Sequence, residues 1–301
     1  MPKTKKNHKT LFVFIKLILF AVVLFLLYKQ IREVDEKQWE DFHIMHPLAF
    51  VITLLFTIPN IGFAFLKWEL TLKTIGVKMK KRQRVQSFFA GVVTGMLTPN
   101  MLGNFIGRFY YFDRKYRIQI TLFTLLSNFA QFIASITFGW IAVLILGGLL
   151  IFEDEDQFLI WIGLIMIAAY LIYFFIENFL VKLRKKKYLT EFHSILFSHR
   201  KYRFQLLGLS FARFLIFTTQ FSLLLYAFGE EINLALITAI WQVYLLTMIA
   251  PSLFLGKIGV KESISLFVLG AIGINGYSIL FSSLIIWLII GVIVCKNETT
   301  E

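Results

Sequence analysis

The sequence predicts an all-α, polytopic membrane helix bundle, and the observations behind this prediction are its composition, the charge of its connectors and a repeated hairpin motif. Of the 301 residues, 58% are hydrophobic and 16% are charged, whereas a soluble domain carries about 25% charged residues. A soluble fold could not hide so much apolar surface, but a bilayer solvates it directly. We therefore expect residues 1–301 to form a single membrane domain in the cell (inner) membrane.

The predicted spans are apolar runs of roughly 20 residues, the length that crosses a bilayer. Runs that qualify as full crossings are 11–28, 47–66, 118–148, 158–181, 204–228 and 275–295. The first is expected to be a retained helix, because it is long for a signal core and no small-residue cleavage site follows it. Two further runs, 85–107 and 234–262, are apolar but are interrupted by proline and glycine.

The charge of the connectors predicts the orientation of these spans. Connectors 67–84 and 182–203 are rich in lysine and arginine, whereas 151–157 and 229–233 contain acidic residues and no basic ones. The positive-inside rule places the amino terminus and both basic connectors in the cytoplasm, and six crossings then place the carboxyl terminus there as well. Because the cations fall in short clusters between apolar runs, they indicate a membrane protein and no nucleic-acid partner.

The first interrupted run is predicted to be a re-entrant hairpin. The segment 108–117 is also basic, yet only 85–107 separates it from the cytoplasmic connector 67–84. A hairpin that enters from the cytoplasm and returns keeps the cations of both segments on one side. Pro99 lacks an N–H and disfavours a continuous helix, and the glycine-containing halves have the length of re-entrant pieces. Eight plain spans are the alternative.

The second interrupted run repeats the motif of the first. Residues 96–107 read M-L-T-P-N-M-L-G-N-F-I-G, and residues 248–259 read M-I-A-P-S-L-F-L-G-K-I-G. The order of elements matches between halves 1–150 and 151–301, and each half holds an odd number of crossings. The sequence therefore predicts an inverted-topology repeat. Interrupted segments at corresponding places in two such halves indicate a transporter's substrate site near the bilayer midplane.

Three stretches carry a family resemblance. They are F-L-K-W-E-L-T-L-K-T-I-G-V (Phe65–Val77), S-F-F-A-G-V-V-T-G-M-L-T-P-N-M-L-G-N-F-I-G-R (Ser87–Arg108) and P-S-L-F-L-G-K-I-G-V-K-E (Pro251–Glu262). Together they resemble the lysylphosphatidylglycerol synthase/flippase transmembrane-region family over essentially the whole chain. The resemblance implies a bacterial or archaeal inner-membrane protein, related to modules that move aminoacylated or isoprenoid-type lipids between leaflets. The positions that match the family pattern are Trp68, Pro99, Gly103, Arg108, Pro251, Gly256, Gly259 and Glu262.

The chain also departs from the family pattern. Asn104 stands where an acidic residue often follows the first hairpin's glycine, and Lys257 stands where a second glycine is usual. The soluble aminoacyl-transferase domain of the synthases is not expected after Cys295, so the resemblance does not imply lipid aminoacylation.

Arg213 is the most informative single residue. It lies nine residues into the span 204–228, so about 14 Å deep at 1.5 Å per residue. An arginine there costs about 2.5–3.5 kcal/mol on insertion scales, and it should therefore face a partner or a cavity. One hypothesis is a clamp for a lipid phosphate, which a guanidinium contacts with two hydrogen bonds. The alternatives are a structural pair with Glu262 or Glu177, or snorkelling.

Three other residues have expected roles at the hairpins. Arg108 lies at the cytoplasmic mouth of the first hairpin, where it would meet the headgroup at loading. Glu262, at the exit of the second hairpin, either takes up a proton and couples transport to the proton gradient, or pairs with a cation such as Lys261. Trp68 fits an interfacial anchor.

The sequence thus predicts a lipid flippase that uses membrane lipids as partners and needs no cofactor or metal. The candidate substrate-binding or translocation residues are Arg213, Arg108, Glu262, Pro99, Gly103, Asn104, Pro251, Gly256 and Gly259. The alternatives are a non-transporting scaffold or accessory subunit and a membrane-embedded lipid-modifying transferase. Against the transferase, the sequence offers no paired carboxylates at catalytic spacing and no Ser-His-Asp set, and its histidines lie in predicted polar connectors.

Overall fold

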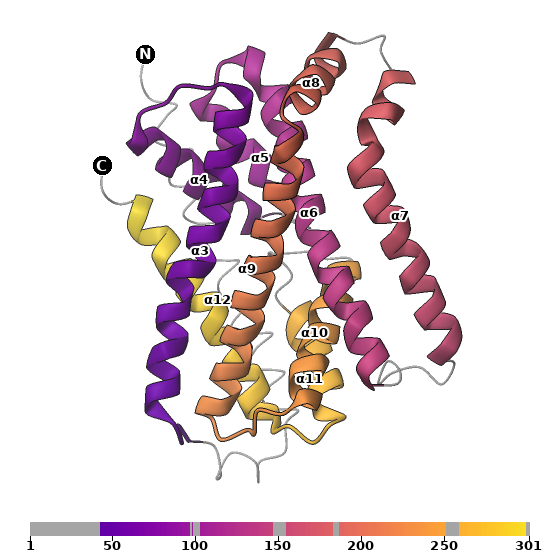
Figure 1. Ribbon diagram of the computed structural model, residues 1–301. Helices are drawn as coiled ribbons and strands as arrows, with labels where there is room; N and C mark the ends of the chain where they lie inside the picture. The colour runs from indigo at the N-terminus through magenta and orange to yellow at the C-terminus, as the bar shows by residue number, and fades with distance from the viewer. Residues whose placement is uncertain are drawn as a thin grey trace.

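The computed structural model describes residues 43–96, 98, 103–146, 155–182, 187–250 and 259–298. This part of the chain is a bundle of helices without a β-strand, which confirms the predicted all-α class (Figure 1). The elements are α3 (Pro47–Ile75), α4 (Lys81–Met96), α5 (Gly103–Arg108), the 3-10 helix η2 (Phe109–Tyr111), α6 (Arg114–Leu146), α7 (Glu155–Lys182), α8 (Lys187–Ser198), α9 (Arg200–Ala227), α10 (Leu234–Ile249), α11 (Val260–Gly270) and α12 (Gly276–Glu298).

Within the described residues, four helices are long and apolar enough to cross a membrane, namely α3, α6, α7 and α9. Each overlaps one of the predicted spans over nearly all of its length and runs most of the height of the molecule (Figure 1). The predicted span 11–28 lies outside the described residues. The predicted span 275–295 falls in α12, in which the apolar helix Gly276–Ile289 is described. The membrane bundle is therefore confirmed, and the number of six crossings stays a prediction.

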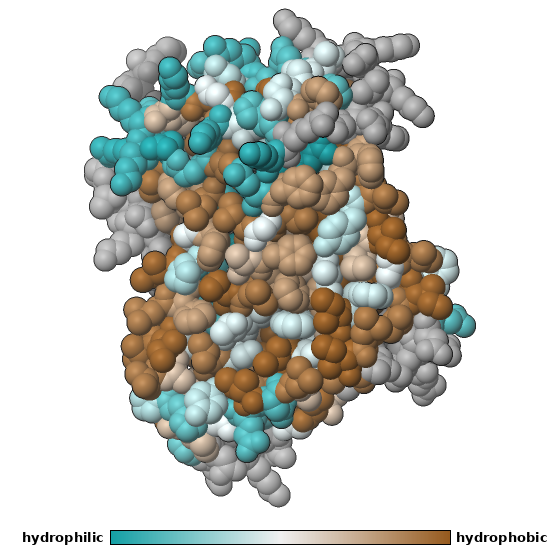
Figure 2. All heavy atoms as spheres, in the orientation of Figure 1, coloured by the Kyte–Doolittle hydropathy of each residue, from teal (hydrophilic) through white to brown (hydrophobic). Residues whose placement is uncertain are grey.

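The surface has a hydrophobic band and two polar ends. Figure 2 shows hydrophobic side chains around the middle of this face, with hydrophilic residues gathered above and below it. The upper end is formed where α3 ends and where α4, α6 and α9 begin, and we call it the basic end (Figure 1). Its exposed side chains include Lys78, Lys80, Lys81, Lys115 and Lys201. This distribution is the one expected of a bundle whose apolar band lies in a bilayer.

The first interrupted run folds back on itself, as a hairpin must. A Cβ atom added to Gly103 would lie 2.2 Å from the carbonyl oxygen of Thr94, and one added to Gly107 would lie 2.4 Å from that of Ala90. Because later residues of α5 meet earlier residues of α4, the two helices run antiparallel. Only glycine permits this close approach of two backbones. The predicted hairpin geometry is thus present, and its entry into the membrane from the cytoplasm stays a prediction.

The second interrupted run, 234–262, forms α10 and the first turn of α11. These two helices are neighbours and lie in the half of the molecule opposite to α4 and α5 (Figure 1). Asn233 caps α10, because its side-chain oxygen accepts a hydrogen bond from the backbone N–H of Leu236 at 2.8 Å. This placement is the one that an inverted repeat requires, and the repeat itself stays a prediction. Both hairpin prolines, Pro99 and Pro251, lie outside the described residues.

Three predicted connectors contain more helix than the sequence indicated, and in one of them, after run 234–262, α11 continues to Gly270. Helix α3 continues through the first part of connector 67–84 and stops at Gly76, whose φ of 77° is left-handed. The N–H of Val77 then bonds to the carbonyl of Leu72 at 3.1 Å, which is the Schellman pattern of helix ends. Connector 182–203 holds α8 and the start of α9. Helix α8 packs Phe192 against Phe123 of α6, and this buried contact explains why it folds.

Candidate functional site

Three cationic side chains from separate helices lie inside the bundle, between its middle and the basic end. They are Lys67 of α3, Arg108 of α5 and Arg213 of α9, and we call them the cation cluster. The charges of Arg213 and Arg108 both act on the Lys67 ammonium. Lys67 is 4% exposed and Arg108 is 7% exposed, although lysine and arginine are almost never this buried unless they are paired.

Lys67 is inside the bundle because α3 runs on to Gly76. The helix therefore places Lys67 about two turns before its own end, and not in a connector. Its Nζ donates a hydrogen bond to the backbone carbonyl of Ser127 in α6 at 3.0 Å. An ammonium has three N–H donors. Among the described residues, one of these donors has an acceptor.

Arg108 is held against an aromatic surface. Its guanidinium lies 4.1 Å from the centre of the Trp68 ring, and one terminal nitrogen donates to the hydroxyl of Thr124 at 3.1 Å. The Nε atom is buried without a partner among the described residues. Nearby, the side-chain oxygen of Asn104 is buried in the same way, and both atoms lie beside Gly91. The first hairpin thus brings unused donor and acceptor capacity to the cluster.

Arg213 lies about halfway along α9, opposite the midpoint of α3. Its Nε donates to the side-chain oxygen of Asn60 at 3.2 Å. Asn60 donates in turn to Gln220 at 3.3 Å, and Gln220 donates to the hydroxyl of Thr57 at 2.9 Å. This chain of hydrogen bonds fixes the side of Arg213 that faces α3. The two terminal nitrogens of Arg213 have no partner within the described part of the chain.

No carboxylate whose side chain the structure describes pairs with the cation cluster, and the side chain of Glu177, a predicted partner of Arg213, lies outside that set. Glu69, the acidic neighbour of Lys67 on α3, forms its ion pair with Arg84. Glu191 accepts a hydrogen bond from Gln119 at 3.0 Å. A buried charge without a partner costs several kcal/mol, so an anion that entered here would recover part of that cost.

Glu262 accepts hydrogen bonds from its own hairpin and from α12. One carboxylate oxygen accepts the backbone N–H of Gly259 at 2.7 Å, and the other accepts the hydroxyl of Ser283 in α12 at 2.7 Å. These contacts cap the first turn of α11, since Glu262 satisfies a backbone donor that the helix leaves free. Gly259 has a φ of 82°, which favours glycine there. Neither Arg213 nor Lys261 forms an ion pair with Glu262; the Lys261 ammonium instead lies 4.7 Å from the ring centre of Phe221.

The sequence predicted most residues of this site, but not all of them. The predicted Arg108, Arg213 and Asn104 lie in or beside the cation cluster, and Gly103 provides the close packing that positions Arg108. Gly256 and both hairpin prolines lie outside the described residues.

The missed residues are Lys67, which was counted with a connector, and Asn60. Gly76 is the signal that could have found Lys67, because glycine is the usual residue just past a helix end. Trp68 was expected at the membrane interface, but it is 2% exposed and donates to the Arg84 carbonyl at 3.2 Å. Trp68 is therefore an interior platform under Arg108.

Comparison with known families gives a match over nearly the entire chain. The family model described as lysylphosphatidylglycerol synthase TM region matches residues 13–295. No curated protein and no solved structure matched the chain.

Proposed function

Since this chain belongs to the lysylphosphatidylglycerol synthase transmembrane-region family, we propose that it moves an amphipathic lipid with an anionic headgroup between the two leaflets of the cell membrane. The observation that carries the proposal is the cation cluster, which has unused hydrogen-bond donors and no carboxylate partner among the described residues. A phosphate supplies what the cluster lacks, because it offers negative charge and several acceptor oxygens at once.

The positions of the cations give the proposed route a direction. Lys67 and Arg108 lie toward the basic end, and Arg213 lies about halfway along α9. The headgroup would first meet Lys67 and Arg108 and then pass to Arg213, while the acyl chains stay in the hydrocarbon. The guanidinium groups of Arg108 and Arg213 suit these two steps, since a planar guanidinium binds a phosphate with two parallel hydrogen bonds. The proposal assigns no bond-making step to the protein.

The hydrogen bonds beside Arg213 hold its side chain in one orientation. Asn60 occupies one nitrogen of the guanidinium, and Gln220 holds Asn60 in turn. The terminal nitrogens are left for a ligand. A purely structural arginine at this depth would be expected to donate hydrogen bonds to backbone or carboxylate oxygens. Arg203 does so, since it donates to the carbonyl of Phe174.

The test uses the purified full chain in proteoliposomes that contain labelled phosphatidylglycerol, phosphatidylcholine or a polyprenyl-phosphate-linked lipid. We expect faster transfer of the anionic lipids. Arg213→Gln should lower that transfer about tenfold or more, because hydrogen bonds to charged groups contribute about 1.5–3 kcal/mol each. The thermal stability of this variant should be equal or higher, since it removes a charge that the protein does not compensate.

Arg114→Gln is the matched control, because it removes the same charge from an exposed position at the basic end. Its transfer rate should stay within about twofold of the wild type, as screening weakens exposed charges. Equal transfer by the Arg213 and Arg114 variants would contradict the proposed route. If the chain moves none of the three lipids, the scaffold hypothesis replaces the flippase one.

A further inference from the structure

A second feature, separate from the cation cluster, is a pocket of about 860 Å³ at the basic end. It lies between α3, α4 and α9, and its volume is near the upper end of the roughly 300–1,000 Å³ typical of ligand pockets. Leu66, Leu70 and Leu209 are among its apolar lining residues. Leu66 is 50% exposed, so this wall is open toward the side of the bundle and the surrounding bilayer.

The pocket arises from the way α3 ends. Leu66, Leu70 and Lys73 are spaced by four and three residues, so they share one face of the helix. Lys67 and Thr71 lie on another face, and Thr71 contacts Tyr202 of α9. After Gly76 the chain turns and carries Lys78 back over the opening. The pocket-lining face and the cluster-lining face of α3 are therefore different.

The α9 side of the pocket is open because position 208 is glycine. Gly208 lies within α9, is exposed and lines the pocket. A Cβ atom added there would have no heavy atom within 4 Å. A Cβ atom at this position therefore meets no protein atom, and a longer side chain there would start from the lining of the pocket.

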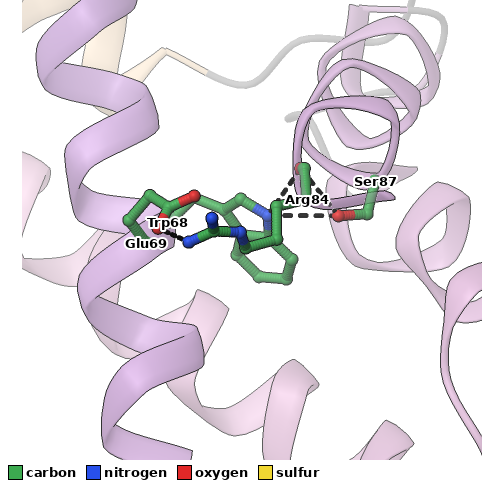
Figure 3. A network of polar contacts seen from close by, with 4 residues as sticks. All are labelled: Trp68, Glu69, Arg84 and Ser87. Carbon is green, nitrogen blue, oxygen red and sulfur yellow. Dashed lines mark hydrogen bonds and ion pairs between the residues drawn. The ribbon is translucent and has the colours of Figure 1, made fainter. Parts of the chain in front are cut away.

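The rim of the pocket is cationic. Lys73 and Lys78 are exposed and line it together with Arg84. Glu69 is the acidic residue of the lining, and it pairs with Arg84 across the gap between α3 and α4 (Figure 3). The two lysines are thus left to attract an anion. Lysines that lie just beyond an apolar surface place their ammonium groups at the level of lipid headgroups.

We propose that this pocket binds an anionic phospholipid from the leaflet at the basic end. One acyl chain lies along Leu66, Leu70 and Leu209, and Lys73 and Lys78 hold the phosphate. Trp68 connects this site to the cation cluster, because its N–H bonds to the Arg84 carbonyl (Figure 3) while its ring lies under Arg108. The binding does not depend on transport, since a scaffold would hold the same lipid.

The experiment uses the full chain in nanodiscs with phosphatidylglycerol that carries a photoreactive acyl chain, and the same probe on phosphatidylcholine. Mass spectrometry then locates the labelled peptides. We expect phosphatidylglycerol to label residues 64–80 or 204–212, and phosphatidylcholine to label them less. Lys73→Gln with Lys78→Gln should lower phosphatidylglycerol labelling about fivefold per lysine, which is the effect of one charge near a membrane surface.

Two controls separate this site from general lipid contact. Gly208→Leu should abolish labelling in the pocket by either lipid, whereas Gly270→Leu, at an equally open helical glycine near the opposite end, should leave it unchanged. Lys81→Gln with Lys115→Gln removes two exposed charges from the same end outside the pocket, and it should change labelling less than twofold.

Two results would overturn the proposed site. They are equal labelling by both lipids, and labelling that Gly208→Leu does not reduce. Arg213→Gln should not alter this labelling. A failure of lipid transfer would therefore leave the pocket result standing, and the reverse also holds.

Discussion

The two hairpins share a sequence pattern but treat charge in opposite ways. The first hairpin places Arg108 on Trp68 with its Nε atom buried and unbonded among the described residues. The second hairpin buries Glu262 with both carboxylate oxygens accepting hydrogen bonds from Gly259 and Ser283. One hairpin therefore leaves part of a buried charged group without a partner among the described residues, while the other uses charge to complete its own helix. A repeated backbone motif therefore does not imply a repeated chemical role.

The hairpins also differ in what packs around them. Phe221, Ile240, Val268 and Ile279 belong to one buried apolar cluster that joins α10 and α11 to α9 and α12. The first hairpin instead packs helix against helix through glycines, and its charged end meets α3 and α6 through Trp68 and Thr124. Apolar packing makes the second hairpin a support, and we expect changes there to alter stability before they alter lipid transfer.

The largest expected effect is on the glycine packing of the first hairpin. Gly103→Ala would place a methyl group 2.2 Å from the Thr94 carbonyl oxygen, and overpacking of this kind costs about 1–3 kcal/mol or more. We expect a clearly lower melting temperature of the purified protein and a loss of lipid transfer. Gly62→Ala is the control, since a Cβ atom there has no neighbour within 4 Å. Equal melting temperatures for the two variants would show that α4 and α5 do not pack in this way.

A smaller effect is expected at Glu262. Glu262→Ala removes the acceptor for the Gly259 N–H and for the Ser283 hydroxyl, and losing a helix cap costs about 0.5–2 kcal/mol. Stability should fall by that amount, while the transfer rate per folded molecule stays unchanged. Glu231→Ala makes the same change at an exposed position and should leave both quantities as they are. Selective loss of transfer in Glu262→Ala would instead support proton coupling at this residue.

The smallest expected effect is a pH dependence at the end opposite the basic end. Burial raises the pKa of Glu230 above 4.5, although hydrogen bonds from Ser278 and from the Asn275 backbone act in the other direction. The folded state therefore binds this proton more tightly than the unfolded state. The stabilisation from Glu230 is complete below pH 4.5 and is lost as the pH rises through the raised pKa.

Melting temperatures between pH 4 and pH 7 test this sign for Glu230. Over that range the wild type should lose stability relative to Glu230→Gln, which cannot titrate but keeps an oxygen for the Asn275 N–H. Glu231→Gln, one residue away and exposed, should follow the wild-type curve. Parallel curves for the wild type and Glu230→Gln would contradict the raised pKa.

The sequence alone determined the membrane class of the fold and the position of its long helices. Apolar runs of membrane length predicted α3, α6, α7 and α9, because the bilayer fixes how long a crossing helix must be. Proline and glycine in the two interrupted runs predicted the hairpin of α4 and α5 and the break after α10, because these residues change what the local backbone can adopt. The length of α11 beyond residue 262 was not predicted. Arg213 was found because a cation in an apolar run is costly wherever the chain folds. Arg108 was found because it lies at the mouth of the first hairpin and matches the family pattern.

Only the tertiary structure decided which charges act together. Lys67 joins Arg108 and Arg213 because α3 packs along α9 and because Trp68, the neighbour of Lys67, lies against Arg108 of α5. Residues so far apart in sequence carry no local sign of this arrangement. Glu262 turned out to cap α11 because Ser283 of α12 lies within reach of its second oxygen. Hydrogen bonds and charge pairs extend over only a few ångströms, so their partners depend on packing that periodicity and composition do not encode.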